Sequence, residues 1–341
     1  MIGVDVGQRL DGRPLRVPLE QWSTLLGGLP GSGKSSTLRC VVAGAGLRDD
    51  VALVLLDPKR VELPIWRSRA TAVAVELDDV TAVLGSLVAL LDQRYEAMEL
   101  AGDLYWPRTA LAPQVLVVID ELAELVDSGE GGDKDRERLL RRLLSKGRAA
   151  GVIVVAATQR PSADVLSTSV RDLFSLRIAH ACATREASTM ILGRTEAGFA
   201  DALPIGAGHE GLAFVLGEGE REPVLARVDW LDPSRARQLA AEVAHLRPVL
   251  ELPAAVVGVV PPARPWSAPA ASGASRSASG NVAVRGAILA AMRAGDVTAP
   301  AISRATALRD DLVRAELAAL ADDGFVVRVN GSMWSLVGVS A

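Results

Sequence analysis

Cysteine is scarce in this chain of 341 residues, and positive charge is not in excess. Neither Cys40 nor Cys182 lies in a C-x-x-C or Cys/His cluster, which excludes a disulfide framework and a structural zinc site and favours a reducing, cytoplasmic setting. The 37 Lys and Arg residues face 41 Asp and Glu residues, giving a formal net charge of -4. Only a local basic patch could therefore hold a nucleic acid.

Long apolar runs and targeting signals are also missing. The apolar stretches at residues 115–119 and 151–157 have the length of strands, whereas a membrane-spanning helix needs about 18 apolar residues. The N-terminal residues do not have the composition of a signal peptide. We therefore expect a soluble protein that would reach a membrane only through an anchored partner.

One glycine-rich stretch organises the chain. It fits the Walker A pattern G-x-x-x-x-G-K-[ST], between a short strand at residues 23–26 and a helix at residues 35–46. Its glycines let the backbone wrap around phosphates, which the free N–H groups of the helix start bind. Lys34 would reach the β- and γ-phosphates of a nucleotide, and the Ser35 hydroxyl would ligate Mg²⁺. The predicted nucleotide-binding residues are Gly28, Leu29, Pro30, Gly31, Ser32, Gly33, Lys34 and Ser35.

A second motif follows an apolar strand at residues 113–119. Asp120 and Glu121 lie at the C-terminal end of this strand, where open α/β sheets bind ligands. In this Walker B pattern Asp120 would hold Mg²⁺, directly or through water, and Glu121 would polarise the attacking water as general base. The alternative is an acidic cap on the strand, but the P-loop upstream favours the catalytic interpretation. No N-K-x-D motif selects guanine, so we expect ATP.

Other apolar runs extend the sheet. Residues 51–56 and 151–157 lack polar alternation, which is typical of parallel strands covered on both faces and predicts an α/β fold with a mostly parallel sheet. Thr158 and Gln159 follow the second run and are candidate γ-phosphate sensors, unless they only form a turn. An arginine-rich helix at residues 136–150 could line a pore or face solvent. Further strands are expected at 72–77, 174–180, 211–216 and 223–228, further helices at 78–100 and 233–246, and a hairpin or strand within 1–22, beside the nucleotide site.

The composition changes after residue 250. Residues 1–250 are expected to form the nucleotide-binding domain, and the Pro-, Ala- and Ser-rich residues 251–280 a flexible linker. Residues 281–341 are expected to hold helices at 284–294, 299–306 and 310–322, then two strands joined by Asn330 and Gly331. Three helices followed by a hairpin predict a C-terminal winged-helix domain.

A winged helix places its third helix in the major groove of DNA, and its hairpin touches the backbone. Arg309, Arg314 and Arg328 are the candidate DNA contacts. Residues 281–341 hold six Arg against six acidic residues, a balance that is poor for unaided DNA binding. Docking of a protein partner is therefore the alternative use of this domain.

Several ordered segments resemble the motor domain of the FtsK/SpoIIIE family of DNA-translocating ATPases. They are the P-loop, Asp57-Pro58-Lys59 with Glu62-Leu63, Gln93-Arg94-Tyr95, Val117-Val118-Ile119-Asp120-Glu121, Gly147-Arg148-Ala149-Ala150-Gly151, Ala157-Thr158-Gln159-Arg160-Pro161 and Arg177-Ile178-Ala179. They span roughly residues 20–230. The resemblance implies a RecA-like fold, a hexameric ring with ATP sites between subunits, and double-stranded DNA in the pore. It implies no small-molecule substrate beyond ATP.

The resemblance also suggests a role for one strand arginine. Arg177 stands where the family carries an arginine that reaches a neighbour's γ-phosphate, and such a finger stabilises the transition-state charge. Arg148 is the alternative. The family's membrane-spanning N-terminus and the module before the motor are expected to be missing or reduced here. The chain thus resembles a compact mobile-element transfer ATPase.

Two other functions fit these motifs. Related motors pump proteins through secretion systems, usually with several tandem motor domains, whereas we recognise one here. A nucleotide-controlled DNA-binding regulator would rely on the winged helix, but Glu121 supplies the group that hydrolysis needs. The leading expectation is ATP-driven translocation of double-stranded DNA, in plasmid or integrative-element transfer.

Overall fold

The structure is a computed structural model. It describes residues 3–129, 131–162, 165, 167–193, 202–203, 205, 208–217, 220, 222–250, 252–253, 288, 291–292, 298–306, 309–322, 326–330 and 333–336. The chain divides into two compact units, Met1–Trp266 and Ser267–Ala341. The expected linker at 251–280 and most of the expected helix at 284–294 lie outside the described residues.

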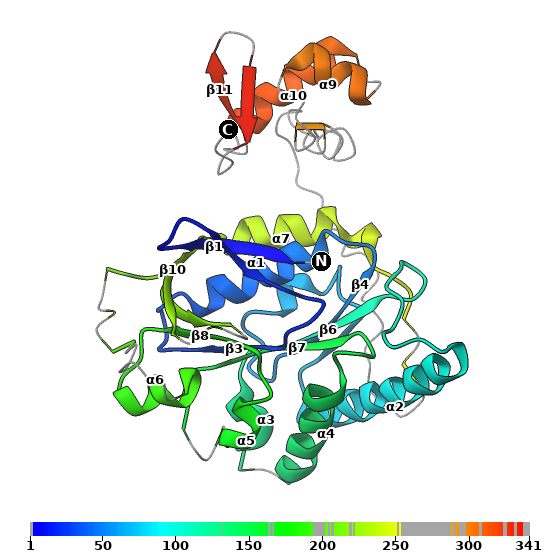
Figure 1. The fold of residues 1–341 in the computed structure, drawn as a ribbon, viewed down its shortest axis with the longest axis vertical. Helices are drawn as coiled ribbons and strands as arrows, with labels where there is room; N and C mark the ends of the chain where they lie inside the picture. The colour runs from blue at the N-terminus through cyan, green and yellow to red at the C-terminus, as the bar shows by residue number, and fades with distance from the viewer. Residues whose placement is uncertain are drawn as a thin grey trace, which may run out of the picture. The chain divides into compact units, whose positions relative to one another are not determined.

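A ten-stranded sheet forms the centre of the first unit (Figure 1). Its strands are β1 (Val4–Arg9), β2 (Pro14–Val17), β3 (Thr24–Gly27), β4 (Val51–Leu56), β5 (Ala72–Ala74), β6 (Gln114–Ile119), β7 (Val152–Thr158), β8 (Leu176–His180), β9 (Leu212–Leu216) and β10 (Val224–Val228). They are ordered β2-β1-β10-β9-β8-β3-β7-β6-β4-β5. The strands from β8 to β5 run parallel, and β9, β10, β1 and β2 extend the sheet in antiparallel fashion. The predicted α/β class with a mostly parallel sheet is confirmed.

The central strands are buried on both faces. Every residue of β4, β6 and β7 is buried, as their unbroken apolar runs predict. In the parallel register Leu56 pairs with Ile119, Ile119 with Ala156, and Gly27 with Thr158. The C-terminal ends of β3, β7, β6 and β4 therefore meet at one edge of the sheet. The motifs that follow these strands converge there.

Helices cover both faces of the sheet (Figure 1). On one face α1 (Lys34–Gly46) and α7 (Pro233–Glu242) pack together, with the short 3₁₀ helix η1 (Pro64–Trp66) beside α7. The other face carries α2 (Leu77–Ala101), α3 (Leu122–Val126), α4 (Asp133–Lys146), α5 (Thr168–Arg171) and α6 (Arg185–Leu192). Each face encloses its own apolar cluster. The first unit is thus a three-layer structure.

Some predicted boundaries are wrong. The strand expected at 72–77 ends at Ala74 because α2 already begins at Leu77, and the helix expected at 136–150 is α4, which spans Asp133–Lys146. Helix α4 starts early because Gly132, with φ 90°, ends the preceding loop in the left-handed conformation. Helix α7 stops at Glu242, and a separate 3₁₀ helix, η2 (Ala244–Leu246), follows it.

Arg136 was expected to line a pore or face solvent, and this is wrong. Its side chain is buried, where Nε donates a hydrogen bond of 2.6 Å to the Leu125 carbonyl and Nη1 one of 3.3 Å to the Gly131 carbonyl. Nη2 also bonds Ser128 Oγ at 3.2 Å and pairs with Asp133. Arg136 therefore joins α4 to the loop after α3.

Arg94 gives the Gln93-Arg94-Tyr95 segment a structural role. Its buried guanidinium donates hydrogen bonds to the carbonyls of Ala150 (2.8 Å), Gly151 (3.2 Å) and Pro113 (2.7 Å), just before β7 and β6 begin. It also lies 4.6 Å from the centroid of the Trp106 ring, a cation–π contact. Arg94 thus fastens α2 to the N-terminal ends of two central strands.

Replacing Arg94 with Met should lower the free energy of unfolding by about 2–4 kcal/mol, because it removes a charged donor from three buried carbonyls, of which Gly151 keeps the bond from the Val115 N–H. Urea unfolding measures the change. Arg138→Met is the matched control, since Arg138 is an exposed arginine of α4 that pairs only with Asp135 among the described contacts. Equal losses in the two variants would contradict this role for Arg94.

The second unit contains α9 (Ala299–Thr306), α10 (Asp310–Asp322) and a hairpin of β11 (Val326–Asn330) and β12 (Met333–Leu336). Ile302, Val313 and Leu317 are buried in its own apolar cluster. The two predicted helices and the pairing of the two strands that follow them are confirmed; Gly331 of the predicted Asn-Gly turn lies outside the described residues, and the winged-helix domain as a whole stays a prediction. Across the described residues of the chain, no helix is both long and apolar enough to cross a bilayer.

Candidate nucleotide-binding site

The P-loop joins β3 to α1 and follows a tight path that glycines permit. Gly28 and Gly33 have φ values of 150° and 111°. A Cβ atom on Gly28 would lie 2.7 Å from the Cβ of His180, and one on Gly33 would lie 2.7 Å from the backbone of Gly211. Any side chain at these positions would push the loop away from the residues that support it.

Backbone hydrogen bonds hold the loop in place. The Leu29 N–H donates to the Ala181 carbonyl at 2.8 Å, and the Gly211 N–H donates to the Ser32 carbonyl at 2.9 Å. The Ser32 hydroxyl closes the loop on the Leu29 carbonyl at 2.7 Å. Helix α1 starts at Lys34, so the first N–H groups of α1 have no acceptor within the helix and are available to an anion.

His180 anchors this arrangement from the end of β8. Burial lowers the pKa of His180 to about 4, so the imidazole is neutral. Its Nδ1–H donates to the Leu212 carbonyl at 3.1 Å, which leaves Nε2 to accept a 2.8 Å hydrogen bond from the Thr37 hydroxyl of α1. His180 therefore links β8, β9 and α1 beneath the loop.

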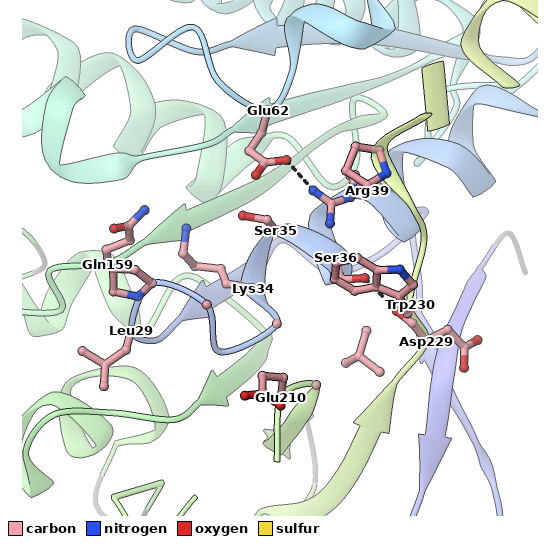
Figure 2. Close-up of a pocket in the computed structure, with 16 residues that line it drawn as sticks. Leu29, Lys34, Ser35, Ser36, Arg39, Glu62, Gln159, Glu210, Asp229 and Trp230 are labelled. Atoms are coloured by element: carbon pink, nitrogen blue, oxygen red, sulfur yellow. Dashed lines mark hydrogen bonds and ion pairs between the residues drawn. The ribbon is translucent and has the colours of Figure 1, made fainter. Parts of the chain in front are cut away.

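A cavity of about 570 Å³ opens above the P-loop (Figure 2). Such a volume is typical of small-molecule sites. In Figure 2, Lys34 and Gln159 lie toward one side of the loop, and Arg39 and Trp230 toward the other. The cavity is lined by Leu29, Pro30, Gly31, Gly33, Lys34, Ser35, Ser36, Arg39, Glu62, Gln159, Glu210, Gly211, Val228, Asp229, Trp230 and Pro233.

Asp120 follows β6 and is 4% exposed. Burial raises the pKa of its carboxyl group to about 6, although the nearby Lys34 ammonium opposes the shift. Its Oδ1 is buried without a hydrogen-bond partner, so one oxygen remains free for a ligand. Among the described residues, no cluster of three His, Cys, Asp or Glu side chains forms a complete metal site. Asp120 and Ser35 fit Mg²⁺ nonetheless, because Mg²⁺ commonly uses one or two carboxylates together with phosphate oxygens.

Glu121 is 1% exposed and held in place by two partners. The backbone N–H of Gln159 donates to both carboxylate oxygens at 3.1 Å. Lys59 Nζ lies 3.2 Å from Oε2 of Glu121, and 3.6 Å from Oε1 of Glu124. The candidate general base is therefore a buried carboxylate oriented by residues that follow β4 and β7.

Lys59→Met should destabilise the protein by about 1–3 kcal/mol, because Glu121 would keep a buried charge without its ion-pair partner. The free energy of unfolding in urea measures this loss. In a Glu121→Gln background the same substitution should cost less, since a neutral amide needs no ion partner. A loss of equal size in both backgrounds would contradict the ion pair.

Asp57, in the Asp57-Pro58-Lys59 segment, shapes the next loop. Its buried Oδ2 accepts hydrogen bonds from the N–H groups of Glu62 (3.1 Å) and Leu63 (3.0 Å). Glu62 in turn pairs with Arg39 of α1, with its Oε2 2.7 Å from Nη1. The Asp57 carboxylate thus orders the backbone of this loop, and the Glu62 carboxylate lines the cavity.

The candidate sensors are placed differently from each other. Thr158 is buried, and its hydroxyl accepts a 3.1 Å hydrogen bond from the Arg160 N–H, which is the turn expected as the alternative. Gln159 lines the cavity and orients Glu121 through its backbone. Sensing by either residue stays a prediction.

The candidate arginine fingers are not among the described residues that line the cavity. Arg177 lies on β8, with Nη1 3.8 Å from Oδ1 of Asp172, and burial lowers its pKa. Arg148 is exposed beyond the end of α4. A role of either arginine at the ATP site of a neighbouring subunit therefore stays a prediction.

The candidate DNA contacts are exposed in the second unit, but each has a neighbour. Arg309 pairs with Asp311, and Arg314 Nε lies 2.6 Å from Asp310 Oδ2. The Arg328 guanidinium lies 5.5 Å from the centroid of the Trp334 ring. The two ion pairs agree with the neutral charge balance of this region.

Several residues that line the cavity or hold the candidate general base received no role from the sequence, among them Lys59, Arg39, Glu62 and Trp230. Lys59 and Glu62 lie in a recognised segment, and the adjacency of β4 and β6 could have indicated that Lys59 meets Glu121. Arg39 and Trp230 have no such signal, because 191 positions of sequence separate them.

The model of the FtsK/SpoIIIE family matches residues 2–103. "Protein Tra" of Streptomyces lividans is 32% identical over 215 residues, which cover 58% of this chain and 34% of the relative. "DNA translocase FtsK" of Halalkalibacterium halodurans is 29% identical over 214 residues, 56% of this chain and 27% of the relative. This chain thus matches about a third or less of the length of these relatives.

Solved structures share the fold. The pCW3 conjugation coupling protein TcpA, solved with ATPgS, is 25% identical, covers 72% of this chain and 70% of that chain, and has a TM-score of 0.61. The cytoplasmic domain of the type VII secretion ATPase EccC of Thermomonospora curvata is 22% identical and has a TM-score of 0.56. The match covers 70% of this chain and 31% of that chain. The second likeness concerns the fold alone. The family resemblance drawn from the motifs is confirmed: the FtsK/SpoIIIE family model matches the region that holds the P-loop, and proteins named as DNA translocases are similar to this chain.

Proposed function

We propose that this chain is an ATP-hydrolysing motor that translocates double-stranded DNA. The observation that carries the proposal is a P-loop cavity lined by Lys34 and Gln159, each beside a buried carboxylate. The Gln159 N–H bonds Glu121, and the Lys34 ammonium lies near Asp120. An unpaired Asp120 oxygen suits a metal, and a fixed, buried Glu121 suits a general base. The family match and the relatives named as DNA translocases support DNA as the cargo.

Each residue of the site has a distinct task in this proposal. The free N–H groups at the start of α1 and the Lys34 ammonium bind the phosphates. Ser35 and Asp120 would hold Mg²⁺, which neutralises charge on the phosphate oxygens. Glu121 orients the attacking water and accepts its proton, while the Gln159 N–H and Lys59 keep the carboxylate in position. Thr158 and Gln159 would sense the γ-phosphate.

Assembly completes the proposed motor. We place ATP between the subunits of a homo-hexameric ring, with Arg177, or alternatively Arg148, reaching the γ-phosphate of a neighbour. DNA would pass through the pore. The second unit would act as a winged helix that touches DNA through Arg309, Arg314 and Arg328 or docks a protein.

The biological setting we favour is transfer of a plasmid or integrative element in the cytoplasm, with a membrane-anchored partner where transfer crosses an envelope. The names of two similar proteins, a Tra protein and a conjugation coupling protein, support this choice over cell division. Protein secretion is the competing use of the same fold, because a secretion ATPase shares it.

The steady-state ATPase rate with and without long double-stranded DNA tests the proposal. Strong stimulation by DNA, absent in the Glu121→Gln variant, is the expected result. ATPase activity that ignores DNA would contradict DNA translocation and favour a protein cargo. Absence of any Mg²⁺-dependent hydrolysis by the full chain would contradict the motor itself.

A further inference from the structure

The end of the cavity away from Gln159 contains an unusually exposed aromatic side chain. Trp230 follows β10 and is 72% exposed, although it lines the cavity together with Arg39, Val228 and Pro233 (Figure 2). A large indole surface left in water is costly unless a ligand or partner covers it. Because Trp230 lines the P-loop cavity, a nucleotide bound in that cavity is the ligand best placed to cover the indole.

The backbone around Trp230 is fixed to α1. The Ser36 hydroxyl donates a 2.9 Å hydrogen bond to the Asp229 carbonyl and accepts a 3.1 Å hydrogen bond from the Leu231 N–H. One side chain of the nucleotide-binding helix thus holds both neighbours of Trp230. The indole is exposed, but its attachment point is not free to move away from the cavity.

Arg39 is held equally firmly beside the indole. Its guanidinium is largely buried, pairs with Glu62 at 2.7 Å and donates a 3.0 Å hydrogen bond from Nε to the Leu231 carbonyl. The guanidinium carbon lies 5.4 Å from the centroid of the Trp230 ring, within cation–π range. Two flat groups, one aromatic and one cationic, therefore meet at this end of the cavity.

We propose that Trp230 and Arg39 form the base subsite, which takes the purine ring of the nucleotide by stacking. This inference rests on the proposed binding of ATP and names the residues that recognise its base. The phosphate end is fixed by the P-loop, and Arg39 lies five residues beyond Lys34, about 7.5 Å farther along the axis of α1. An extended nucleotide whose phosphates lie at the start of α1 places its base toward this end.

Stacking predicts a particular form of selectivity. An aromatic platform recognises the π face of a base and tolerates changes at its edge, so purines with different edges should bind similarly and better than pyrimidines, whose stacking area is smaller. Inorganic tripolyphosphate, which has no base, should gain nothing from Trp230. The difference between these ligands isolates the subsite from the phosphate site.

Calorimetric titration of the full chain with ATP and with inorganic tripolyphosphate, both with Mg²⁺, tests the proposal. Trp230→Ala should weaken ATP binding by about 10-fold, within the range of a lost base–aromatic stack, and leave tripolyphosphate binding unchanged. Trp230→Phe, which keeps a ring, should restore most of the ATP affinity. Nucleotide should also quench tryptophan emission in the wild type and not in Trp230→Phe.

Two results would overturn the subsite: ATP binding to Trp230→Ala that equals the wild type, or an equal loss for ATP and tripolyphosphate. These results leave the proposed motor untouched. Binding of neither ligand by the wild type would overturn both proposals. ATP binding that depends on Trp230, without DNA-dependent hydrolysis, would support the base subsite while the motor proposal fails.

Discussion

Glu121→Gln is expected to slow ATP hydrolysis by about 10²–10⁴-fold while ATP still binds, because the variant removes only the proton-accepting group. The amide is nearly the same size as the carboxylate, and its oxygen can still accept the N–H of Gln159. The loop after β7 should therefore keep its position. Single-turnover hydrolysis and nucleotide titration measure the two steps separately.

Glu124→Gln is the matched control for this variant. Glu124 also lies near Lys59, at 3.6 Å, but its side chain is 43% exposed, whereas Glu121 is 1% exposed and is held by the Gln159 N–H. The Glu124→Gln variant should hydrolyse ATP at close to the wild-type rate. A Glu121→Gln variant that keeps its hydrolysis rate, or a Glu124→Gln variant that loses as much, would contradict Glu121 as the general base.

Asp120→Asn is expected to abolish Mg²⁺-dependent hydrolysis and to stabilise the nucleotide-free protein. In the folded chain the carboxyl group keeps its proton up to a pKa of about 6, whereas its usual pKa is 3.8. The folded state therefore binds more protons in this window, and stability falls as pH rises through it. Above pH 6 a cost of about 1–3 kcal/mol remains, which the neutral amide avoids.

Urea unfolding at pH 5 and pH 8, without nucleotide or Mg²⁺, measures this stabilisation. The gain in Asp120→Asn should be larger at pH 8, where the wild-type carboxylate is ionised. Asp103→Asn, at an exposed position, should show no such difference. Equal stability of Asp120→Asn and the wild type at both pH values would contradict a buried carboxylate whose ionisation lowers the stability of the folded state.

The strands and the phosphate loop were predictable because their causes are local. A parallel strand covered on both faces is a continuous apolar run, as in β4 and β6, and a P-loop needs glycines at fixed spacing. The signal that predicted the paired strands of the second unit is equally local. Short helices such as α3 and α5 escaped notice because four or five residues show no periodicity.

The rest of the site depends on residues that are distant in the sequence. Trp230 meets Arg39 only because β10 joins the sheet through β1 and β9 and then leads back to α1. Arg94 received no structural role from the sequence, and Arg136 was expected to line a pore or face solvent, yet carbonyl groups of other elements accept hydrogen bonds from both buried guanidinium groups. Such contacts follow from strand order and register, which composition and periodicity do not specify.

Displacement of a triplex-forming strand from double-stranded DNA is the most direct test of translocation, because it reports movement along DNA and not ATP turnover alone. We expect ATP-dependent displacement by the wild-type chain and none by Glu121→Gln or Lys34→Ala. DNA-stimulated hydrolysis by the wild type without displacement of the third strand would contradict translocation.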